Sequence, residues 1–259
     1  MSVNSYLAGR ASSAVLSEDE RKSINTSIAT LGTRLESWFQ VDGDKLQSHF
    51  RFGSQTRGTI LPRRDDPYSD VDYMVVFEKG ARKPQSYLDR LKKFVEGKYS
   101  TSEVYQSSPT IVLELNHIRF ELVPALHSFS STYQIPNGPN DWQYTSPNDF
   151  NATLEEKNKN NSYLIKPTIR LAKIWNAANG YVFNSYLFEK WICDRSFFFA
   201  SNHRDYLFTV FDNLQATETA AWKNERISRA KKLVADIREN ESQGYPYLAE
   251  ADAKKLIPE

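Results

Sequence analysis

The stretch FGSQTRGTILPRRDDPYSDVDYMVVF, from Phe52 to Phe77, places two aspartates directly before an apolar run. That run, Tyr73 to Phe77, is typical of a buried strand. Asp70 and Asp72 are separated by one residue, and side chains two positions apart leave the same face of a strand. Two carboxylates beside a core repel each other and resist burial unless a cation neutralises them. The stretch is therefore a candidate metal site at the start of a strand.

The same aspartates also have a simpler structural explanation. Asp70 can cap a turn that follows Pro67-Tyr68-Ser69, and Asp72 can lie at the solvated end of the strand. The pattern Asp-x-Asp is common in proteins, so taken alone it is weak evidence for catalysis.

A third acid lies in a second pair of apolar segments. The sequence TIVLELNHIRFELVPAL, residues 110–126, predicts two strands joined near Asn116-His117, and Glu121 is in the second. If this strand neighbours the first, Glu121 can lie beside the aspartates on the polar face, and three such oxygen donors suit Mg²⁺. Pairing with Arg119 on the same strand face, or exposure on an edge strand, explains Glu121 equally well.

Gly53-Ser54 precedes a segment that predicts a short helix. A glycine permits close approach of the backbone to a ligand, and a serine at a helix start offers amide and hydroxyl donors to phosphate oxygens. On its own, however, a Gly-Ser pair is usually only a turn. Arg57 is similarly ambiguous, because it can bind phosphate or pair with Asp65 or Asp66.

Composition excludes several classes of protein. The chain of 259 residues has a formal net charge of +1, so it lacks the basic excess of a nucleic-acid coat protein. Cys193 is the only cysteine and the histidines are scattered, which argues against a zinc site. The N-terminal segment has no apolar core of signal-peptide length, and no segment approaches the roughly 20 apolar residues of a membrane span. We therefore expect a cytoplasmic protein that does not bind membranes.

The order of the predicted elements indicates an α+β fold. A capping box of Ser17 with Glu20 starts an N-terminal amphipathic helix, and residues 84–99 predict another. Residues 128–149 are rich in Ser, Asn, Pro and Gly, which favours a long loop or crossover. From Asn158 the pattern is helical. We therefore expect a mixed-sheet lobe, including the N-terminal helix, at residues 1–150 and a mostly helical lobe at 151–259.

The helical lobe contains a basic stripe of Lys166, Arg170 and Lys173 on one predicted helix. The stripe can bind phosphate, but a solvated helix face is the simpler explanation. In the next helix Tyr186 is surrounded by aromatic residues, and by itself this pattern favours a place in the core.

Taken together, FGSQTRGT, SDVDYMVVF and FELVPA resemble the signature of polymerase-β-like nucleotidyltransferases: a Gly-Ser turn, a strand with paired aspartates, and a third acid on an adjacent strand. The form GSxxRGT, with the third acid inside xLVPA, resembles the bacterial CD-NTase (cGAS/DncV-like, SMODS) family. IRLAKIWNAANGYVFNSYLFEKW is similar to that family's helical segment. The resemblance covers roughly Phe52 to Trp191.

The resemblance implies specific roles. Asp70 and Asp72 would ligate two Mg²⁺ ions, with Mn²⁺ as an alternative, and Glu121 would complete the site of the ion that lowers the pKa of the attacking hydroxyl. The family usually has Asp at this third position, so the extra methylene of Glu121 puts the geometry of that ion in doubt. In the implied nucleotide site Ser54 holds the β- and γ-phosphates, Lys173 and Ser185 reach the triphosphate, and Tyr186 stacks on a base. The nucleotide-binding set comprises Gly53, Ser54, Arg57, Lys173, Ser185 and Tyr186.

The resemblance also implies an activity. The protein would join NTPs into a cyclic di- or trinucleotide, or a short oligonucleotide, that signals to an effector in antiphage (CBASS) defence. Two alternatives stay open: a toxin-type nucleotidyltransferase that modifies tRNA or protein, and a non-catalytic relic that senses nucleotides. The sequence does not specify base preference, linkage, ring size, oligomeric state or an activating partner, and it gives no evidence of a nucleic-acid activator.

Overall fold

The computed structural model describes residues 2–40, 45–78, 80 and 82–259. The chain forms two compact units and crosses between them several times. The sheet unit consists of Ser17–Gly58 and Tyr68–Asn151, and the helical unit of Met1–Leu16, Thr59–Pro67 and Ala152–Glu259. In the described part of the chain, no helix is both long and apolar enough to cross a bilayer.

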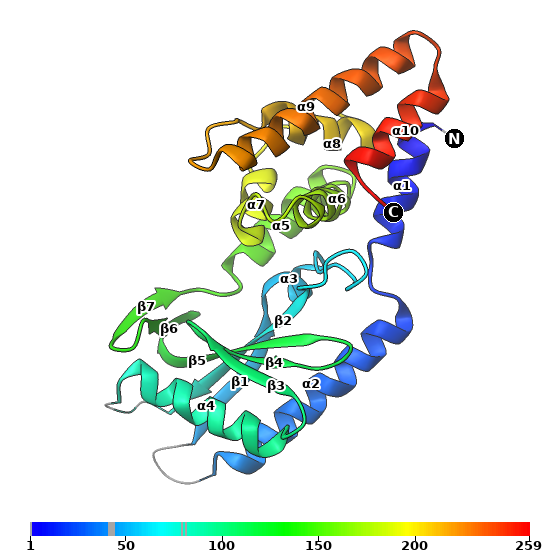
Figure 1. Ribbon diagram of the computed structural model, residues 1–259. Coiled ribbons are helices and arrows are strands. Elements are labelled where there is room, and N and C mark those ends of the chain that lie inside the picture. The colour runs from blue at the N-terminus through cyan, green and yellow to red at the C-terminus, as the bar shows by residue number, and fades with distance from the viewer. Residues whose placement is uncertain (1, 41–44, 79, 81) are drawn as a thin grey trace. The chain divides into compact units, whose positions relative to one another are not determined.

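The sheet unit is built on one mixed sheet of seven strands (Figure 1). The strand order is β1-β2-β5-β4-β3, and β6 pairs with both β5 and β7. β2 and β5 are parallel, whereas the other pairs are antiparallel. The strands are β1 (Leu46–Phe52), β2 (Asp70–Phe77), β3 (Glu103–Ser107), β4 (Thr110–Glu114), β5 (Arg119–Phe129), β6 (Thr132–Asn137) and β7 (Asp141–Thr145).

The two faces of this sheet are covered differently. Helices α2 (Glu18–Trp38) and α4 (Pro84–Lys98) cover the face to which Tyr73 and Phe77 point, where Phe77 contacts the rings of Phe39 and Tyr87. On the opposite face a smaller apolar cluster joins the middle of β2 and β5 to β1 and β6. It comprises Met74, Val76, Val123 and Ala125, with Phe50, Phe52, Tyr133 and Ile135 packed against them. The polar ends of β2 and β5 continue this second face.

The structure confirms the expected helices and core strands of this unit. Ser17 caps α2 by accepting a hydrogen bond from the amide of Glu20 at 3.2 Å, while the Glu20 carboxylate accepts one from the amide of Ser17 at 2.7 Å. The apolar run after the paired aspartates is β2, and the two strands expected around Asn116-His117 are β4 and β5. Local sequence was sufficient for these elements because α2 and α4 each bury one side, whereas the apolar runs of β2 and β4 are buried on both faces.

The expectation of a long loop at residues 128–149 was wrong. β5 continues to Phe129, and β6 and β7 form an antiparallel hairpin with Pro136 opposite Trp142. The turn between them uses Gly138 at a φ of 80°, a conformation that favours glycine. Prolines on both sides of Asn137-Gly138 obscured this hairpin signal. Strand β3 was also not predicted.

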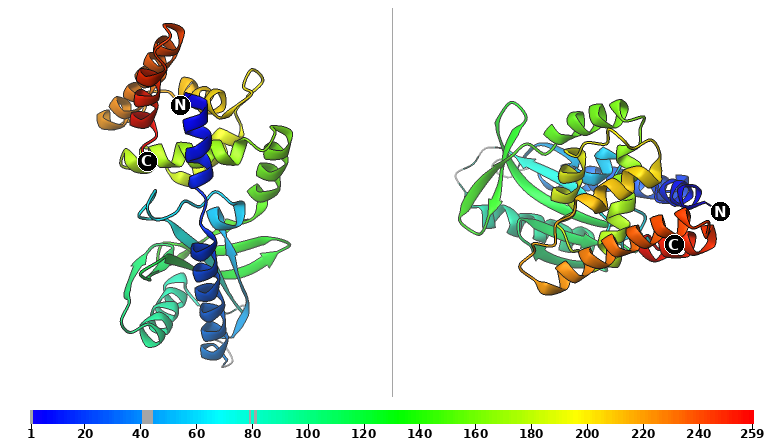
Figure 2. Two further views of the ribbon diagram at one scale, coloured as in Figure 1. Left: turned by 90° about the vertical axis from the view of Figure 1, so that its right-hand side faces the viewer. Right: turned by 90° about the horizontal axis from the view of Figure 1, so that it is seen from above.

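The helical unit is larger than the lobe expected at residues 151–259. Helix α1 (Val3–Ser13) packs side by side with α10, where Tyr6 donates a 2.5 Å hydrogen bond to the carbonyl of Ile257 (Figure 2). This contact gathers the first residues of the chain into the helical unit. The remaining helices are α5 (Asp149–Asn160), α6 (Ile165–Ala178), α7 (Ser185–Cys193), α8 (His203–Asn213), α9 (Ala221–Ser242) and α10 (Pro246–Leu256).

The loop Thr59–Pro67, which connects the Gly-Ser turn to β2, also belongs to the helical unit. Tyr181 donates a 2.5 Å hydrogen bond to Asp66. Asp65, whose side chain is 3% exposed, forms an ion pair with Arg10 of α1. The boundaries of the compact units therefore differ from those of the expected lobes, 1–150 and 151–259. The reason is that long-range polar contacts hold this loop among the helices.

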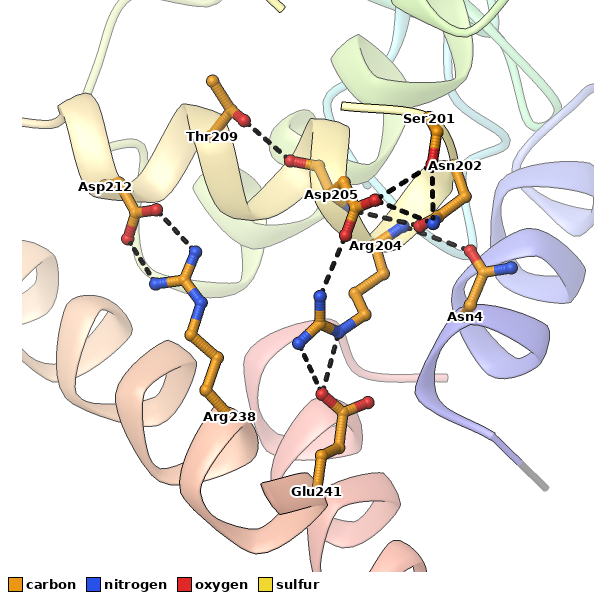
Figure 3. Close-up of polar contacts among 9 residues, drawn as sticks. All are labelled: Asn4, Ser201, Asn202, Arg204, Asp205, Thr209, Asp212, Arg238 and Glu241. Carbon is orange, nitrogen blue, oxygen red and sulfur yellow. Dashed lines mark hydrogen bonds and ion pairs between the residues drawn. The ribbon is translucent and has the colours of Figure 1, made fainter. Parts of the chain in front are cut away.

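Ion pairs also connect α8 to α9 (Figure 3). Arg238 contacts both carboxylate oxygens of Asp212, at 2.9 and 2.6 Å. Arg204 donates from Nε and Nη2 to Glu241, at 2.9 and 2.5 Å. Both guanidinium groups also lie over the ring of Phe208, at 4.7 Å for Arg204 and 5.2 Å for Arg238.

Candidate active site

The acids predicted to bind metal lie at the start of the parallel strands β2 and β5. Their register pairs Asp72 with Glu121 and Asp70 with Arg119. All four side chains are partly buried, whereas Val71 and Phe120 on the other face are fully buried. Parallel pairing therefore brings the third acid beside the aspartates in the register, although 49 positions in the sequence separate Glu121 from Asp72.

The Gly-Ser turn approaches the Asp72 carboxylate very closely. Phe52, the last residue of β1, pairs with Asp72, so the chain turns into α3 (Gly53–Arg57) directly beside that side chain. Gly53 has a φ of 73°, and a Cβ at this position would lie 1.8 Å from Oδ2 of Asp72. Any other residue at position 53 would therefore be both strained and in collision with the carboxylate. Only glycine allows the turn and the aspartate to occupy this arrangement.

Glu121 is held by an arginine on its own strand. Arg119 Nη2 donates to Glu121 Oε1 at 2.7 Å, and Arg119 Nε lies 3.6 Å from Glu114 Oε1. Burial lowers the pKa of Arg119, but the charges of Glu121, Tyr105, Asp70 and Glu114 outweigh it and raise this pKa above its ordinary value. Glu121 therefore pairs with Arg119, which was one of the alternatives from the sequence. It also lies opposite Asp72 in the strand register.

The geometry tests how well these residues fit a divalent ion. Among the described residues, no group of three or more His, Cys, Asp or Glu side chains gathers closely enough to hold a metal. Asp70 and Asp72 nevertheless share one strand face, and Mg²⁺ often uses one or two carboxylates together with water and substrate phosphates. The aspartate pair therefore fits a magnesium ion shared with a nucleotide. The metal role of Glu121 stays a prediction.

Two further predicted residues lie in α3. Ser54 is its second residue and is partly buried. Arg57 is 5% exposed, and its guanidinium lies 5.7 Å from the centre of the Phe150 ring. The pairing of Arg57 with Asp65 or Asp66 stays a prediction.

In the helical unit, Lys173 belongs to a buried polar cluster. Its Nζ lies 3.0 Å from Glu189 Oε1 and donates to the carbonyl oxygen of Thr59 at 3.0 Å. The hydroxyl of Thr59 donates to the same Glu189 oxygen at 2.9 Å. The side chains of Lys173 and Glu189 are only 7% and 1% exposed. A solvated position for Lys173, the simpler explanation of the basic stripe, was therefore wrong.

The other two residues of the basic stripe are also not fully solvated. Lys166 forms an ion pair with Glu155 at 2.5 Å, and burial lowers the pKa of Arg170 to about 10. Ser185 begins α7 and is partly buried, and the adjacent Tyr186 is 44% exposed. The expectation that Tyr186, judged alone, lies in the core was therefore wrong. Its ring is accessible, as stacking on a base requires.

The predicted site residues are distributed over both units. The sheet unit carries Gly53, Ser54, Arg57, Asp70, Asp72 and Glu121, and the helical unit carries Lys173, Ser185 and Tyr186. A nucleotide site that uses both groups stays a prediction.

Sequence reasoning did not identify Glu189 and Thr59 as the partners of Lys173. One available signal was that Glu189 is the only acid in the otherwise aromatic and apolar start of α7, SYLFE, which indicates a buried partner for a base. Thr59 carried no comparable signal, because its contact with Glu189 spans 130 positions in the sequence.

The structure thus combines a strand with paired aspartates, a parallel strand with a third acid and a glycine turn against the first strand, which is the arrangement expected from the resemblance to nucleotidyltransferases. The chain belongs to the SMODS family, the Second Messenger Oligonucleotide or Dinucleotide Synthetase domain, whose model matches residues 1–158. The predicted family and α+β fold are thereby confirmed.

Individual relatives agree with this assignment. A probable cyclic nucleotide synthase of Bacillus cereus (strain VD146) is 24% identical over 182 residues, which are 55% of this chain and 54% of the relative. The match thus spans about half the length of this curated relative.

Two solved structures share the fold. The structure of E. coli MS115-1 CdnC with ATP has a TM-score of 0.73 at 16% identity and covers 99% of this chain and 98% of that one. Vibrio cholerae DncV cyclic AMP-GMP synthase, in complex with the linear intermediate 5′ pppA(3′,5′)pG, has a TM-score of 0.76 at 11% identity, with 99% and 96% coverage. At these identities the likeness shows the fold alone.

Proposed function

We propose that this protein is a metal-dependent nucleotidyltransferase that joins NTPs into a cyclic di- or trinucleotide, or a short oligonucleotide. The observation that carries the proposal is the approach of Gly53 to the Asp72 carboxylate, which is so close that it leaves no room for a side chain at position 53. A stability role does not require glycine against a carboxylate. A site in which phosphate oxygens and a carboxylate share one ion is favoured by such close approach, because the backbone can then reach the phosphates.

In the proposed reaction, a ribose 2′- or 3′-hydroxyl oxygen attacks the α-phosphorus of an NTP. A new P–O bond forms, the bond between the α-phosphorus and the bridging oxygen breaks, pyrophosphate leaves with that electron pair, and the hydroxyl proton passes to solvent. Magnesium, when bound, supplies charge neutralisation at the phosphates and a lowered pKa of the attacking hydroxyl. Asp70 and Asp72 would hold the magnesium ion. Catalysis then consists of positioning the hydroxyl and the NTP and of neutralising the phosphate charge.

The other residues bind the nucleotide. The Ser54 amide and hydroxyl are donors for the β- and γ-phosphates, and the Ser185 hydroxyl is a donor for the triphosphate. The exposed ring of Tyr186 stacks on a base. The Lys173 ammonium has three N–H donors, of which one binds Glu189 and one binds the Thr59 carbonyl, so the third is the donor for the triphosphate.

The product of this reaction acts as a second messenger. We place it in antiphage signalling, in the cytoplasm where NTPs are abundant, with a downstream effector that binds the cyclic or linear oligonucleotide. The support is membership of a family described as a second-messenger synthetase.

The test is turnover of each of the four labelled NTPs, alone and mixed, with Mg²⁺ or Mn²⁺ and mass spectrometry of the products. We expect pyrophosphate release and small nuclease-resistant products, and Asp72→Asn removes both. Asp141→Asn, at an exposed acid at the start of β7, is the matched control and retains them. Label transferred to tRNA or protein instead would favour the toxin-type alternative. Turnover that survives Asp72→Asn would exclude the proposed site.

A further inference from the structure

Arg119 occupies the end of the sheet where the third carboxylate would meet a metal ion. It pairs with Asp70 in the parallel register and with Glu114 in the antiparallel register with β4. Its Nη2 donates to Glu121 Oε1 at 2.7 Å. The guanidinium is thus a cation supplied by the chain itself, surrounded by acids from three adjacent strands.

This position makes Arg119 a competitor for Glu121. A metal ligand must offer an oxygen lone pair, and one Glu121 oxygen is already engaged by a charged donor, which makes the stronger kind of hydrogen bond. A divalent ion beside a guanidinium also meets like charge. Both effects oppose participation of Glu121 as a ligand while Arg119 stays in place. They agree with the absence of a three-carboxylate group among the described residues.

The pair is also able to exchange partners. The side chains of Arg119 and Glu121 are 13% and 22% exposed, so water can solvate either group when the pair opens. Arg119 Nε has no hydrogen-bond acceptor among the described residues, and Glu114 lies 3.6 Å from it. A small shift toward Glu114 would improve that second contact and release Glu121.

We propose that Arg119 is a positioning residue that holds Glu121 away from the metal site and thereby limits metal binding before a nucleotide is present. This inference rests on the proposed metal site at Asp70 and Asp72. The triphosphate carries negative charge, so its oxygens can bind both Arg119 and the metal ion. Arg119 then releases Glu121, which becomes a metal ligand only when substrate is bound.

The test measures Mn²⁺ affinity without nucleotide, by electron paramagnetic resonance of the free ion. Arg119→Met frees Glu121, and we expect the dissociation constant to fall by about tenfold or more. Glu121→Gln alone leaves it unchanged, because Glu121 is not yet a ligand. In the double variant Arg119→Met/Glu121→Gln we expect only the smaller gain that comes from removing the arginine's charge, and the double-mutant cycle isolates the part of the gain that depends on Glu121.

Controls separate this role from general effects. Arg51→Met removes a charge from β1, where Arg51 contacts Asn25 of α2 and not Glu121, and it leaves Mn²⁺ affinity unchanged. If Arg119→Met does not fold, Arg119→Gln provides the same test with a polar side chain. A purely structural role would lower the melting temperature of either variant without changing Mn²⁺ affinity.

The outcomes distinguish the two proposals. If Asp72→Asn does not weaken Mn²⁺ binding, the metal site itself is wrong. If Asp72→Asn weakens binding but the Arg119 variants bind Mn²⁺ as the unaltered protein does, the metal site stands and the role of Arg119 is overturned. Mn²⁺ binding as tight in the double variant as in Arg119→Met would also overturn it, because the gain would not depend on Glu121.

Discussion

Each compact unit contains a cluster of acidic and basic side chains, and the two clusters differ in burial. The sheet cluster (Asp70, Asp72, Arg119 and Glu121) keeps its ion pair 13% and 22% exposed. The helix cluster (Thr59, Lys173 and Glu189) keeps its ion pair 7% and 1% exposed. Opening the helix cluster would leave a charge without water, whereas opening the sheet cluster would not. The first cluster is therefore suited to exchange of ligands and the second to holding the chain in place.

This contrast changes the interpretation of Lys173. From the sequence, Lys173→Ala should chiefly weaken nucleotide binding. The structure adds a second consequence, because the substitution would also leave the buried Glu189 carboxylate without its counter-ion. Stability and substrate affinity must therefore be measured together for any variant of this lysine.

The largest effect is expected in the helix cluster. Glu189→Gln keeps the shape of the side chain but leaves the buried Lys173 ammonium without its counter-ion, which costs about 3–5 kcal/mol of unfolding free energy. Urea denaturation measures this loss. The double variant Lys173→Met/Glu189→Gln recovers most of it. A loss below about 1 kcal/mol for the single variant would show that the two clusters do not differ as their burial indicates.

The next largest effect is expected at the glycine beside the sheet cluster. Gly53→Ala forces the Asp72 carboxylate or the turn to move, and a displacement of about 1 Å at a reacting centre can reduce turnover about a hundredfold. Gly138→Ala is the matched control: this glycine also has a positive φ, of 80°, but a Cβ there has no atom within 4 Å. We expect both variants to lose about 1 kcal/mol of stability from backbone strain, and only Gly53→Ala to lose NTP turnover. Equal turnover in the two variants would contradict the importance of the contact.

A smaller, pH-dependent effect is expected at Tyr6, another buried contact of the helical unit. Burial, followed by the charge of Glu259, raises the pKa of Tyr6 from 10.0 to about 12. Folding therefore favours the neutral phenol, and this contribution is complete below pH 10 and is lost as the pH rises to about 12. Its size is on the order of 2 kcal/mol.

Thermal unfolding at a series of alkaline pH values tests this prediction. Tyr6→Phe should lose stability less steeply than the unaltered protein between pH 10 and 12. Because burial raises the pKa of Tyr73 as well, the comparison is the difference between the two proteins. Parallel curves would show that Tyr6 does not titrate in this range.

The smallest effect is expected at the exposed ion pair of Asp212 with Arg238 (Figure 3). Its side chains are 44% and 45% exposed, so Asp212→Asn should change the unfolding free energy by less than about 1 kcal/mol, and less still at high salt. The pair lies in the helical unit, as Lys173 and Glu189 do. A large loss would therefore show that the type of unit, and not burial, determines the strength of its ion pairs.

The positions of several candidate site residues on their strands were predictable because the signals are local. Alternation placed Asp70 and Asp72 on one face of β2, and the capping box located the start of α2. The apolar segments around Glu121 predicted its strand. The β6–β7 hairpin was missed because Pro136 and Pro139 read as loop residues, and α1 was missed because its buried side is recognisable only against α6, α8 and α10.

The sequence alone determined which side chains leave the same face of a strand, where the helices begin, and the family to which the chain belongs. Only the tertiary structure decided that Glu121 pairs with Arg119, that Lys173 is buried with Glu189, and that the loop Thr59–Pro67 belongs to the helices. The reason is physical. Periodicity is a property of neighbouring residues, whereas the partner of a charged group depends on desolvation and on segments brought together from distant parts of the chain.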